Sequence, residues 1–282
     1  VAMNAGEVLA TGSAAELKAQ TGSQTLEQAF IALLPEAQRQ AHRAVVIPPR
    51  DSREEEIAIE ARGLTMRFGN FVAVDHVNFR IARGEIFGFL GSNGCGKSTL
   101  LKTLAGFIPP VSGGFRWQGK RPVIGWLAQR HALEAQFPLT VQDVVSMGCW
   151  PGMSLFSGFR RETRLRIASA LERVGLASMA LSTIDELSGG QFQRMLFARV
   201  LVQQAPLVML DEPFTGIDEA TSRELMDLIL EMHRQGQTIL AVLHDNQRVA
   251  DFFPETLLLT PQRACWGATR AVLPAFSHVR SA

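Results

Sequence analysis

The main part of the chain alternates short, continuous apolar runs with longer stretches whose apolar positions recur at helical spacing. The continuous runs occupy residues 86–90, 122–128, 207–210, 238–243 and 256–259. Residues 219–232 place apolar side chains on one face of a helix. Runs without polar interruption are typical of strands that are buried on both faces. The pattern predicts an α/β fold with a mostly parallel sheet that helices cover on both sides.

Two other stretches depart from this alternation. Residues 57–61 and, less regularly, residues 74–81 alternate apolar with polar positions, which predicts an antiparallel β lead-in to the main sheet. Gly113 and Gly114 indicate a turn. Residues 140–199 have helical character, so we expect a helical subdomain, at about 135–190, inserted into the β/α alternation.

The N-terminal part reads as an appendage to this domain. Residues 6–10 are a short strand candidate, and apolar positions recur at helical spacing over residues 26–34. Residues 48–56 combine two prolines with a run of charged side chains, a composition that is typical of a solvated linker. We therefore expect an N-terminal extension and linker at 1–56 and the main domain at 57–282.

Composition narrows the class of protein only a little. Contents of 46% hydrophobic and 20% charged residues are ordinary for a globular protein, and a net charge of +1 gives no electrostatic reason to expect nucleic acid as a partner. No apolar run approaches the roughly 20 residues that span a bilayer, so we expect membrane contact through a partner protein. The three cysteines form neither a disulfide framework nor a metal-ligand cluster, which fits a reducing cytoplasm; they are Cys95, Cys149 and Cys265.

A glycine-rich loop follows the apolar run at 86–90. It matches the pattern Gly-x-x-x-x-Gly-Lys-Ser, and a helix-like stretch follows it. Glycines let consecutive N–H groups point inward, where the positive end of the next helix also lies, so such a loop binds phosphate. Lys97 would reach the β- and γ-phosphates, and the Ser98 hydroxyl would ligate Mg²⁺. The predicted nucleotide-binding residues are Gly91, Ser92, Asn93, Gly94, Cys95, Gly96, Lys97, Ser98 and Thr99.

Two further motifs support a nucleotide site. The apolar run at 207–210 ends in Asp211 and Glu212, at the sheet edge where nucleotide sites of α/β proteins lie. Asp211 would hold Mg²⁺, and Glu212 would polarise the attacking water. A second anion-binding nest is expected where a helix begins after Leu187, and its residues are Ser188, Gly189, Gly190 and Gln191.

Together these motifs resemble those of the ATP-binding-cassette (ABC) ATPases over about residues 57–265. Residues 91–99 look like the Walker A motif and residues 207–212 like Walker B, and residues 187–191 are identical to the family's signature motif. The resemblance implies the P-loop NTPase fold of that family, ATP and Mg²⁺ as ligands, and ATP hydrolysis.

The resemblance also assigns positions that the residues alone would not. Gln129 matches the Q-loop glutamine, which contacts Mg²⁺ and senses the transport partner, and Asp218 closes the D-loop position. His244 matches the switch histidine, which reaches the γ-phosphate. Phe68 stands where the family stacks an aromatic ring on adenine. The implied catalytic residues are Lys97, Gln129, Glu212 and His244, and the implied Mg²⁺ ligands are Ser98, Gln129 and Asp211.

The implied assembly is a head-to-tail dimer, in which the signature residues of one subunit complete the ATP site of the other. Its partner is a membrane permease, which places the chain at the cytoplasmic, inner face of the plasma membrane. Residues 129–148 and 210–218 look like importers of zinc and manganese, which implies a periplasmic metal-binding protein as an indirect partner.

The first hundred residues are instead similar to the second cassette of tandem exporter-type or ribosome-associated ABC proteins. The two resemblances meet near residues 99–107, as in a fusion, a recombinant or an assembly artefact, and the residues leave these alternatives open. We favour metal import because partner contacts lie in the helical insert, and the insert falls in the part of the chain that resembles the metal importers. Three alternatives remain: a tandem ABC protein that exports drugs or lipids, an ABC ATPase that acts on ribosomes or DNA, and a module that binds nucleotide without turnover.

Overall fold

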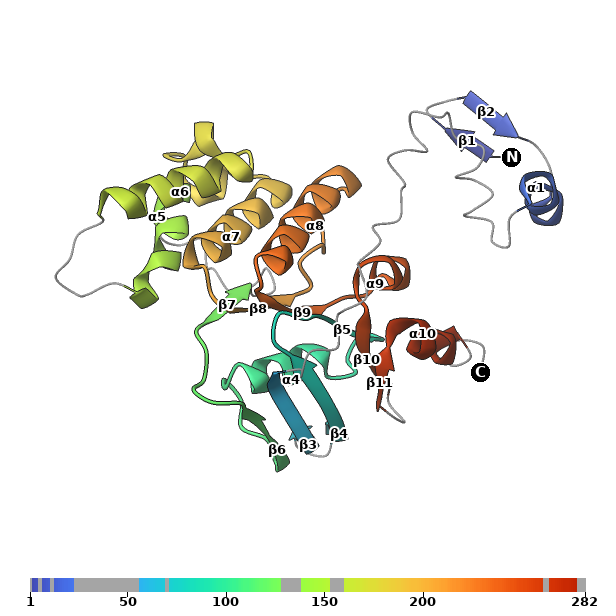
Figure 1. Ribbon diagram of the computed structural model, residues 1–282. Helices are drawn as coiled ribbons and strands as arrows, with labels where there is room; N and C mark the ends of the chain where they lie inside the picture. Colours follow the sequence, from blue (N-terminus) through green and yellow to red (C-terminus); the bar gives the residue numbers. More distant parts are fainter. Residues whose placement is uncertain are drawn as a thin grey trace. The chain divides into compact units, whose positions relative to one another are not determined.

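The computed structural model describes residues 2–4, 7–10, 13–22, 56–68, 71–127, 138–152, 160–260 and 264–277. The chain divides into two compact units, residues 1–49 and 50–282, which are described separately below (Figure 1).

The first unit contains a two-stranded antiparallel sheet, in which β1 (Ala2–Asn4) pairs with β2 (Glu7–Ala10), followed by α1 (Ala14–Thr21). The short strand predicted at 6–10 is confirmed. The helix predicted at 26–34 and nearly all of the predicted linker lie outside the described residues.

The second unit is built on a six-stranded sheet with the strand order β11-β10-β5-β9-β8-β7. The strands are β5 (Ile86–Gly91), β7 (Ile124–Leu127), β8 (Leu207–Asp211), β9 (Thr238–Val242), β10 (Glu255–Leu259) and β11 (Ala264–Ala268). Neighbours from β7 to β10 are parallel, and β11 is antiparallel to β10. Every residue of β5, β8 and β9 is buried, which explains their nearly unbroken apolar sequences. The mostly parallel sheet is confirmed.

This sheet separates two layers (Figure 1). The helices are α4 (Lys97–Leu104), α5 (Val141–Ser146), α6 (Arg161–Arg173), α7 (Gly189–Gln203), α8 (Glu219–Arg234), α9 (Asn246–Phe252) and α10 (Thr269–Ser277). The side chains of β5 alternate between the two buried clusters. Ile86 and Leu90 join the buried cluster that contains residues of α5 to α10, whereas Phe87 and Phe89 join the cluster on the opposite face, to which α4 and the lead-in strands contribute. Short 3-10 turns occupy Met147–Gly152, Ala177–Met179 and Ile184–Glu186. None of the helices among the described residues is long and apolar enough to cross a membrane.

The antiparallel lead-in forms a three-stranded sheet of its own. It consists of β3 (Ile57–Phe68), β4 (Phe71–Ala82) and β6 (Ser112–Trp117), in the order β4-β3-β6. Phe79 packs against Phe87 and Phe89 of the main sheet, with ring centroids 6.2 Å apart in both pairs. The lead-in is confirmed, and its strands are longer than the alternation alone predicted.

The turn predicted at Gly113 and Gly114 is wrong, because both residues lie inside β6. Gly113 has a φ of +67°, and a Cβ there would lie 2.0 Å from the Gly63 carbonyl oxygen. Gly113 therefore permits the close approach of β6 to β3, where the register of the pair shifts between Arg62 and Thr65. The turn prediction failed because the sequence does not show which strand lies opposite.

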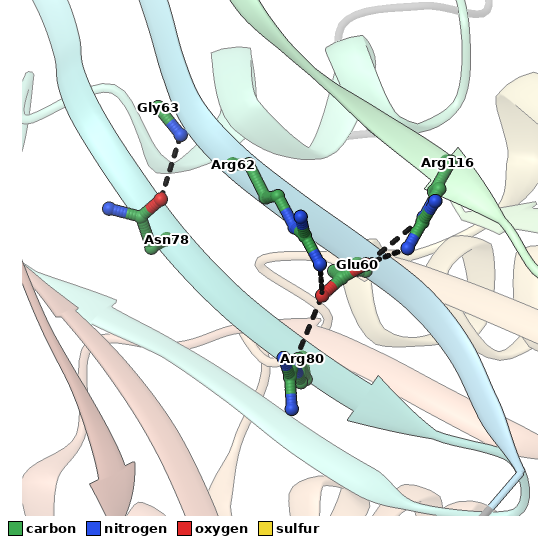
Figure 2. Close-up of polar contacts among 6 residues, drawn as sticks. All are labelled: Glu60, Arg62, Gly63, Asn78, Arg80 and Arg116. Carbon is green, nitrogen blue, oxygen red and sulfur yellow. Dashed lines mark hydrogen bonds and ion pairs between the residues drawn. The ribbon is translucent and has the colours of Figure 1, made fainter.

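The carboxylate of Glu60, on β3, contacts arginines from all three strands of this sheet (Figure 2). Glu60 Oε1 accepts hydrogen bonds from Arg62 at 2.8 Å and Arg80 at 3.1 Å, and Oε2 accepts one from Arg116 at 2.7 Å. The Glu60 side chain is 8% exposed, whereas the three arginines remain mostly exposed. Hydrogen bonds from Arg62 and Arg116 lower the pKa of Glu60 to about 2. The cluster links all three strands.

Candidate functional site

The glycine-rich loop leaves the buried strand β5 and enters α4, as the sequence predicts. Gly91, at the end of β5, has a φ of +151°, and a Cβ there would lie 2.1 Å from the Leu259 carbonyl oxygen of the neighbouring strand. Gly96 has a φ of +90° and is the N-cap of α4. Glycine at both positions lets the loop turn sharply so that the N-terminus of α4 is presented at the carboxyl edge of the sheet.

The lysine of the loop is buried within the loop itself. Lys97 is 4% exposed, and its Nζ donates hydrogen bonds to the carbonyl oxygens of Gly91 at 2.7 Å and Ser92 at 2.8 Å. The sulfur of Cys95 lies 3.7 Å from the same nitrogen. A cation so held is desolvated and has few partners other than carbonyl dipoles, so an anion at the mouth of the loop would be attracted to it.

Ser98 and Asp211 are in contact although they are 113 positions apart in the sequence. The Ser98 hydroxyl donates a hydrogen bond of 2.7 Å to Asp211 Oδ1. Asp211 is 1% exposed, and its other oxygen, Oδ2, has no hydrogen-bond partner among the described residues. Burial is the largest cause that raises the pKa of Asp211, and the hydrogen bond from Ser98 opposes it. A buried carboxylate oxygen that accepts no hydrogen bond and a neighbouring hydroxyl oxygen are ligands that fit a hard divalent cation such as Mg²⁺.

Glu212 and His244 also lie together, at the carboxyl ends of neighbouring parallel strands. His244 Nε2 is 2.6 Å from Glu212 Oε1, and the Thr215 hydroxyl donates to Glu212 Oε2 at 3.3 Å. The Glu212 side chain is 15% exposed and that of His244 is 34% exposed. Glu212 has a φ of +53°, in the left-handed region that side chains other than glycine rarely adopt. Such strain is concentrated at functional positions, where the surrounding structure maintains it.

The predicted signature residues begin α7. Ser188 is the N-cap: its hydroxyl accepts from the Gln191 amide, while the Gln191 side chain accepts from the Ser188 amide. Asp218 is the N-cap of α8, and its carboxylate accepts hydrogen bonds from Thr221, which lower its pKa. A Cβ on Gly190 would lie 4.0 Å from Asp218 Oδ2, so the N-termini of α7 and α8 are neighbours.

These helix N-termini and the glycine-rich loop are not connected by any hydrogen bond or ion pair found within the described parts of the chain. The structure therefore brings the predicted residues together as three groups: the loop with Asp211, the pair Glu212 and His244, and the N-termini that carry Ser188 and Asp218.

Two predicted residues are described only in part or not at all. Phe68 is the last residue of β3 and lies in register with Phe71 of β4, but its side chain is outside the description. Gln129 lies outside the described residues, and β7 ends two positions earlier, at Leu127. Their assigned roles remain predictions.

Sequence reasoning missed two side chains that connect α7 to the loop after Glu212 and to β7. The Gln193 amide of α7 donates to the Pro213 carbonyl oxygen at 2.8 Å, just after Glu212. Arg199, also on α7, donates to the Trp126 carbonyl oxygen at 3.1 Å, and burial lowers its pKa. Both partners are main-chain carbonyls, so no pattern of side chains in the sequence marks these contacts.

Comparison with known proteins gives one consistent family. Residues 74–215 match the family model described as ABC transporter. The manganese transport system ATP-binding protein MntB of Listeria innocua is 37% identical over 73% of this chain and 88% of its own length. The zinc transport system ATP-binding protein TroB of Treponema pallidum is 40% identical over 78% of this chain and 84% of its own length.

Solved structures agree on the fold. The structure of cbiO1 from Clostridium perfringens, part of the ABC transporter complex cbiONQ, is 28% identical with a TM-score of 0.65, covering 80% of this chain and 94% of that one. A dimeric ATP-binding cassette in a post-hydrolysis state, bound to ADP and Pi, has a TM-score of 0.65 at 24% identity, covering 74% of this chain and 98% of that one.

Proposed function

This chain belongs to the ABC transporter family as an ATP-binding subunit, and from that premise we propose that it hydrolyses Mg-ATP at sites shared by two copies to drive the import of manganese or zinc. The relatives carry the choice of substrate, since those at 37% and 40% identity are named for manganese and zinc transport. The metal is cargo of the permease and its binding protein. The chain itself supplies the energy-coupling step.

We assign phosphate binding to the glycine-rich loop that follows β5. The γ-phosphate competes with the carbonyl oxygens of Gly91 and Ser92 for Lys97 Nζ, and a phosphate oxygen is the stronger acceptor because it is charged. The positive N-terminal end of α4 adds to this attraction. Adenine stacking is assigned to Phe68.

Ser98 and Asp211 would hold Mg²⁺, and Gln129 would add a ligand. The unpartnered Oδ2 of Asp211 supports this assignment most directly. When bound, the ion neutralises charge on the phosphate oxygens of the transition state. Asp211 would then remain ionised at neutral pH, although burial alone raises its pKa.

Glu212 acts as the residue that orients and polarises the attacking water, and His244 contacts the γ-phosphate. Their contact of 2.6 Å supports a joint role, because the imidazole fixes the position of the carboxylate that must face the water. When nucleotide enters, His244 Nε2 is shared between the carboxylate and the phosphate.

The signature residues complete the site of a second copy. Ser188 and the N-terminus of α7 present donors that no group in the same chain's glycine-rich loop uses. A second chain, placed head to tail, would bring its γ-phosphate to them, and Asp218 would lie at the same interface. Two ATP molecules would then be enclosed between two chains.

The permease partner would dock where apolar side chains are exposed near β7 and after α5. Phe107 is 64% exposed and packs edge to face on Trp126, with ring centroids 5.3 Å apart. Trp150, in the 3-10 turn after α5, is 58% exposed. Gln129 follows β7, so movement at the nucleotide would reach this surface through that strand. The chain would thus work at the inner face of the plasma membrane.

An uptake assay tests the metal assignment. A strain that lacks the gene is supplied with the wild-type chain or with Lys97→Ala, and radiolabelled manganese and zinc are followed. We expect the wild-type chain to restore uptake of one of the metals and the variant to restore neither. If purified wild-type chain hydrolyses ATP but restores neither metal, import of these metals is excluded.

Export by a tandem ABC protein is the second candidate. Residues 1–49 form a separate compact unit ahead of the ATPase domain, and similarity to a second cassette favours this reading of the N-terminal part. The same strains separate the candidates: loss of resistance to an exported drug, with metal uptake intact, would favour export.

A further inference from the structure

Arg248 lies where three segments around the predicted catalytic pair meet. Its NH2 group donates to Glu219 Oε2 at 2.9 Å, and its Nε is 3.4 Å from Asp245 Oδ2. The guanidinium carbon lies 4.8 Å from the centroid of the Phe214 ring. The Arg248 side chain is 14% exposed. One side chain therefore contacts three different segments at once.

Each contact is adjacent to a residue with a predicted role. Asp245 follows His244 directly in the chain. Phe214 lies two positions after Glu212, in the loop that leads to Asp218. Glu219 is the first residue of α8, whose N-cap is Asp218.

The charges around Arg248 are locally balanced. Asp245 accepts a hydrogen bond from the Arg248 backbone amide at 3.2 Å, so it also caps the helix from which Arg248 projects. Glu219 makes a second ion pair, at 3.5 Å, with Arg223 one turn along α8. Arg223 is mostly exposed, so Glu219 keeps one cationic partner on the surface when Arg248 is changed.

We propose that Arg248 is a positioning residue for ATP hydrolysis, which holds the loop of His244 against the loop of Glu212. The contact of 2.6 Å between His244 and Glu212 joins two loops that end different strands, and Arg248 makes a second connection between the same two loops. This role rests on the proposed functions of Glu212 and His244. Arg248 itself touches no reacting atom.

The guanidinium group suits this position better than an ammonium group. Its central carbon lies over the Phe214 ring while separate nitrogens reach Glu219 and Asp245. A lysine would keep the charge and satisfy one carboxylate, but it would lose the planar contact and the second carboxylate. A methionine would keep only the apolar stem over the ring.

Three variants of the full chain test the proposal: Arg248→Met, Arg248→Lys and, as the matched control, Arg223→Met. Steady-state ATP hydrolysis gives kcat and KM, and thermal melting checks folding. Because small displacements of catalytic groups are costly, we expect Arg248→Met to lower kcat about tenfold, with KM for ATP changed less than about twofold. Arg248→Lys restores kcat to within about threefold of wild type, and Arg223→Met leaves it unchanged.

A double variant tests the route of the effect. If Arg248 acts through Phe214, then Arg248→Met combined with Phe214→Leu lowers kcat by less than the product of the two single effects. An unchanged kcat in both Arg248 variants overturns the proposal, as does an equal loss in Arg223→Met or a rise in KM alone. Should Arg248→Met fail to fold, Arg248→Gln replaces it, because it also removes the charge and the contacts with both carboxylates; the same loss of kcat is expected, and an unchanged kcat overturns the proposal. An inactive wild-type chain would instead overturn the proposed function.

Discussion

At the scale of single residues, the most informative group is the Asp211 carboxylate. One of its oxygens accepts from Ser98, and the other has no donor among the described residues although the side chain is 1% exposed. Leaving a buried charged oxygen unpaired is costly. If Asp211 holds Mg²⁺ as proposed, this cost is present without the cation and is relieved when the cation binds.

Asp211→Asn should separate these two effects. Without Mg²⁺, the variant should melt at the same temperature as the wild type or higher, because the raised pKa of Asp211 shows that the fold disfavours its charge. With ATP, added Mg²⁺ should raise the melting temperature of the wild type but not that of the variant, and hydrolysis should fall by about 100-fold or more.

Asp227→Asn is the control for this experiment, since Asp227 is exposed on α8. It should respond to Mg-ATP as the wild type does. A Mg²⁺-dependent rise in melting temperature in Asp211→Asn would show that the ion is held elsewhere.

Glu60 allows a prediction of pH dependence. Its folded pKa of about 2 lies below the usual 4.5, so its ionised form stabilises the fold. That contribution is complete above pH of about 4.5 and is lost as the pH falls toward about 2. In urea unfolding, Glu60→Gln should lower stability at pH of about 7, and the difference from wild type should shrink below pH of about 4.5.

Glu56→Gln is the exposed counterpart, because Glu56 pairs with Arg83 at 3.3 Å while 73% of its side chain is exposed. Surface pairs of this kind contribute little. A difference between wild type and Glu60→Gln that stays constant down to pH of about 3 would contradict the assigned role of the arginines.

The sequence predicts single residues well where their chemistry is encoded by spacing. The loop that holds Lys97 and the strand end that holds Asp211 follow from residue types at fixed intervals. Contacts such as Gln193 with the Pro213 carbonyl, or Arg248 with the Phe214 ring, depend on how distant segments pack. No local pattern contains that information, so these residues emerge only from the fold.

At the scale of elements, a buried strand can be predicted from its own apolar sequence. Its pairing can be predicted only when the neighbouring strand is known. The continuous apolar runs became the buried strands β5, β8 and β9, as predicted. The pair Gly113 and Gly114 indicated a turn but lies in β6 instead, because the close approach of Gly63 requires glycine at Gly113. A structural constraint does require glycine at this position, but the constraint is contact with a neighbouring strand and not a turn.

Gly113→Ala should therefore destabilise the protein much more than Gly114→Ala. A Cβ on Gly113 would lie 2.0 Å from the Gly63 carbonyl oxygen and would require a positive φ, whereas a Cβ on Gly114 meets nothing within 4 Å. We expect a loss of about 2 kcal/mol or more in the free energy of unfolding for Gly113→Ala. Urea unfolding measures it, and equal effects of the two substitutions would refute the close approach of β6 to β3.

At the scale of the whole molecule, the predicted site residues fall into groups that no hydrogen bond or ion pair joins within the described residues. The glycine-rich loop, Asp211 and Glu212 lie at the carboxyl edge of the main sheet, and the N-termini of α7 and α8 carry Ser188 and Asp218. Our central claim is that a second copy brings these groups together around ATP. The family and fold were predictable from the motifs; the assembly was implied by the family resemblance and remains a prediction.

Light scattering coupled to size-exclusion chromatography of Glu212→Gln tests this claim most directly. Without its polarising carboxylate the variant should bind Mg-ATP and not hydrolyse it, so the enclosed state should accumulate. We predict the mass of two chains with Mg-ATP and of one chain when Lys97→Ala is added to the same variant. A single-chain mass for Glu212→Gln with saturating Mg-ATP, from a protein whose wild-type form hydrolyses ATP, would contradict the shared site.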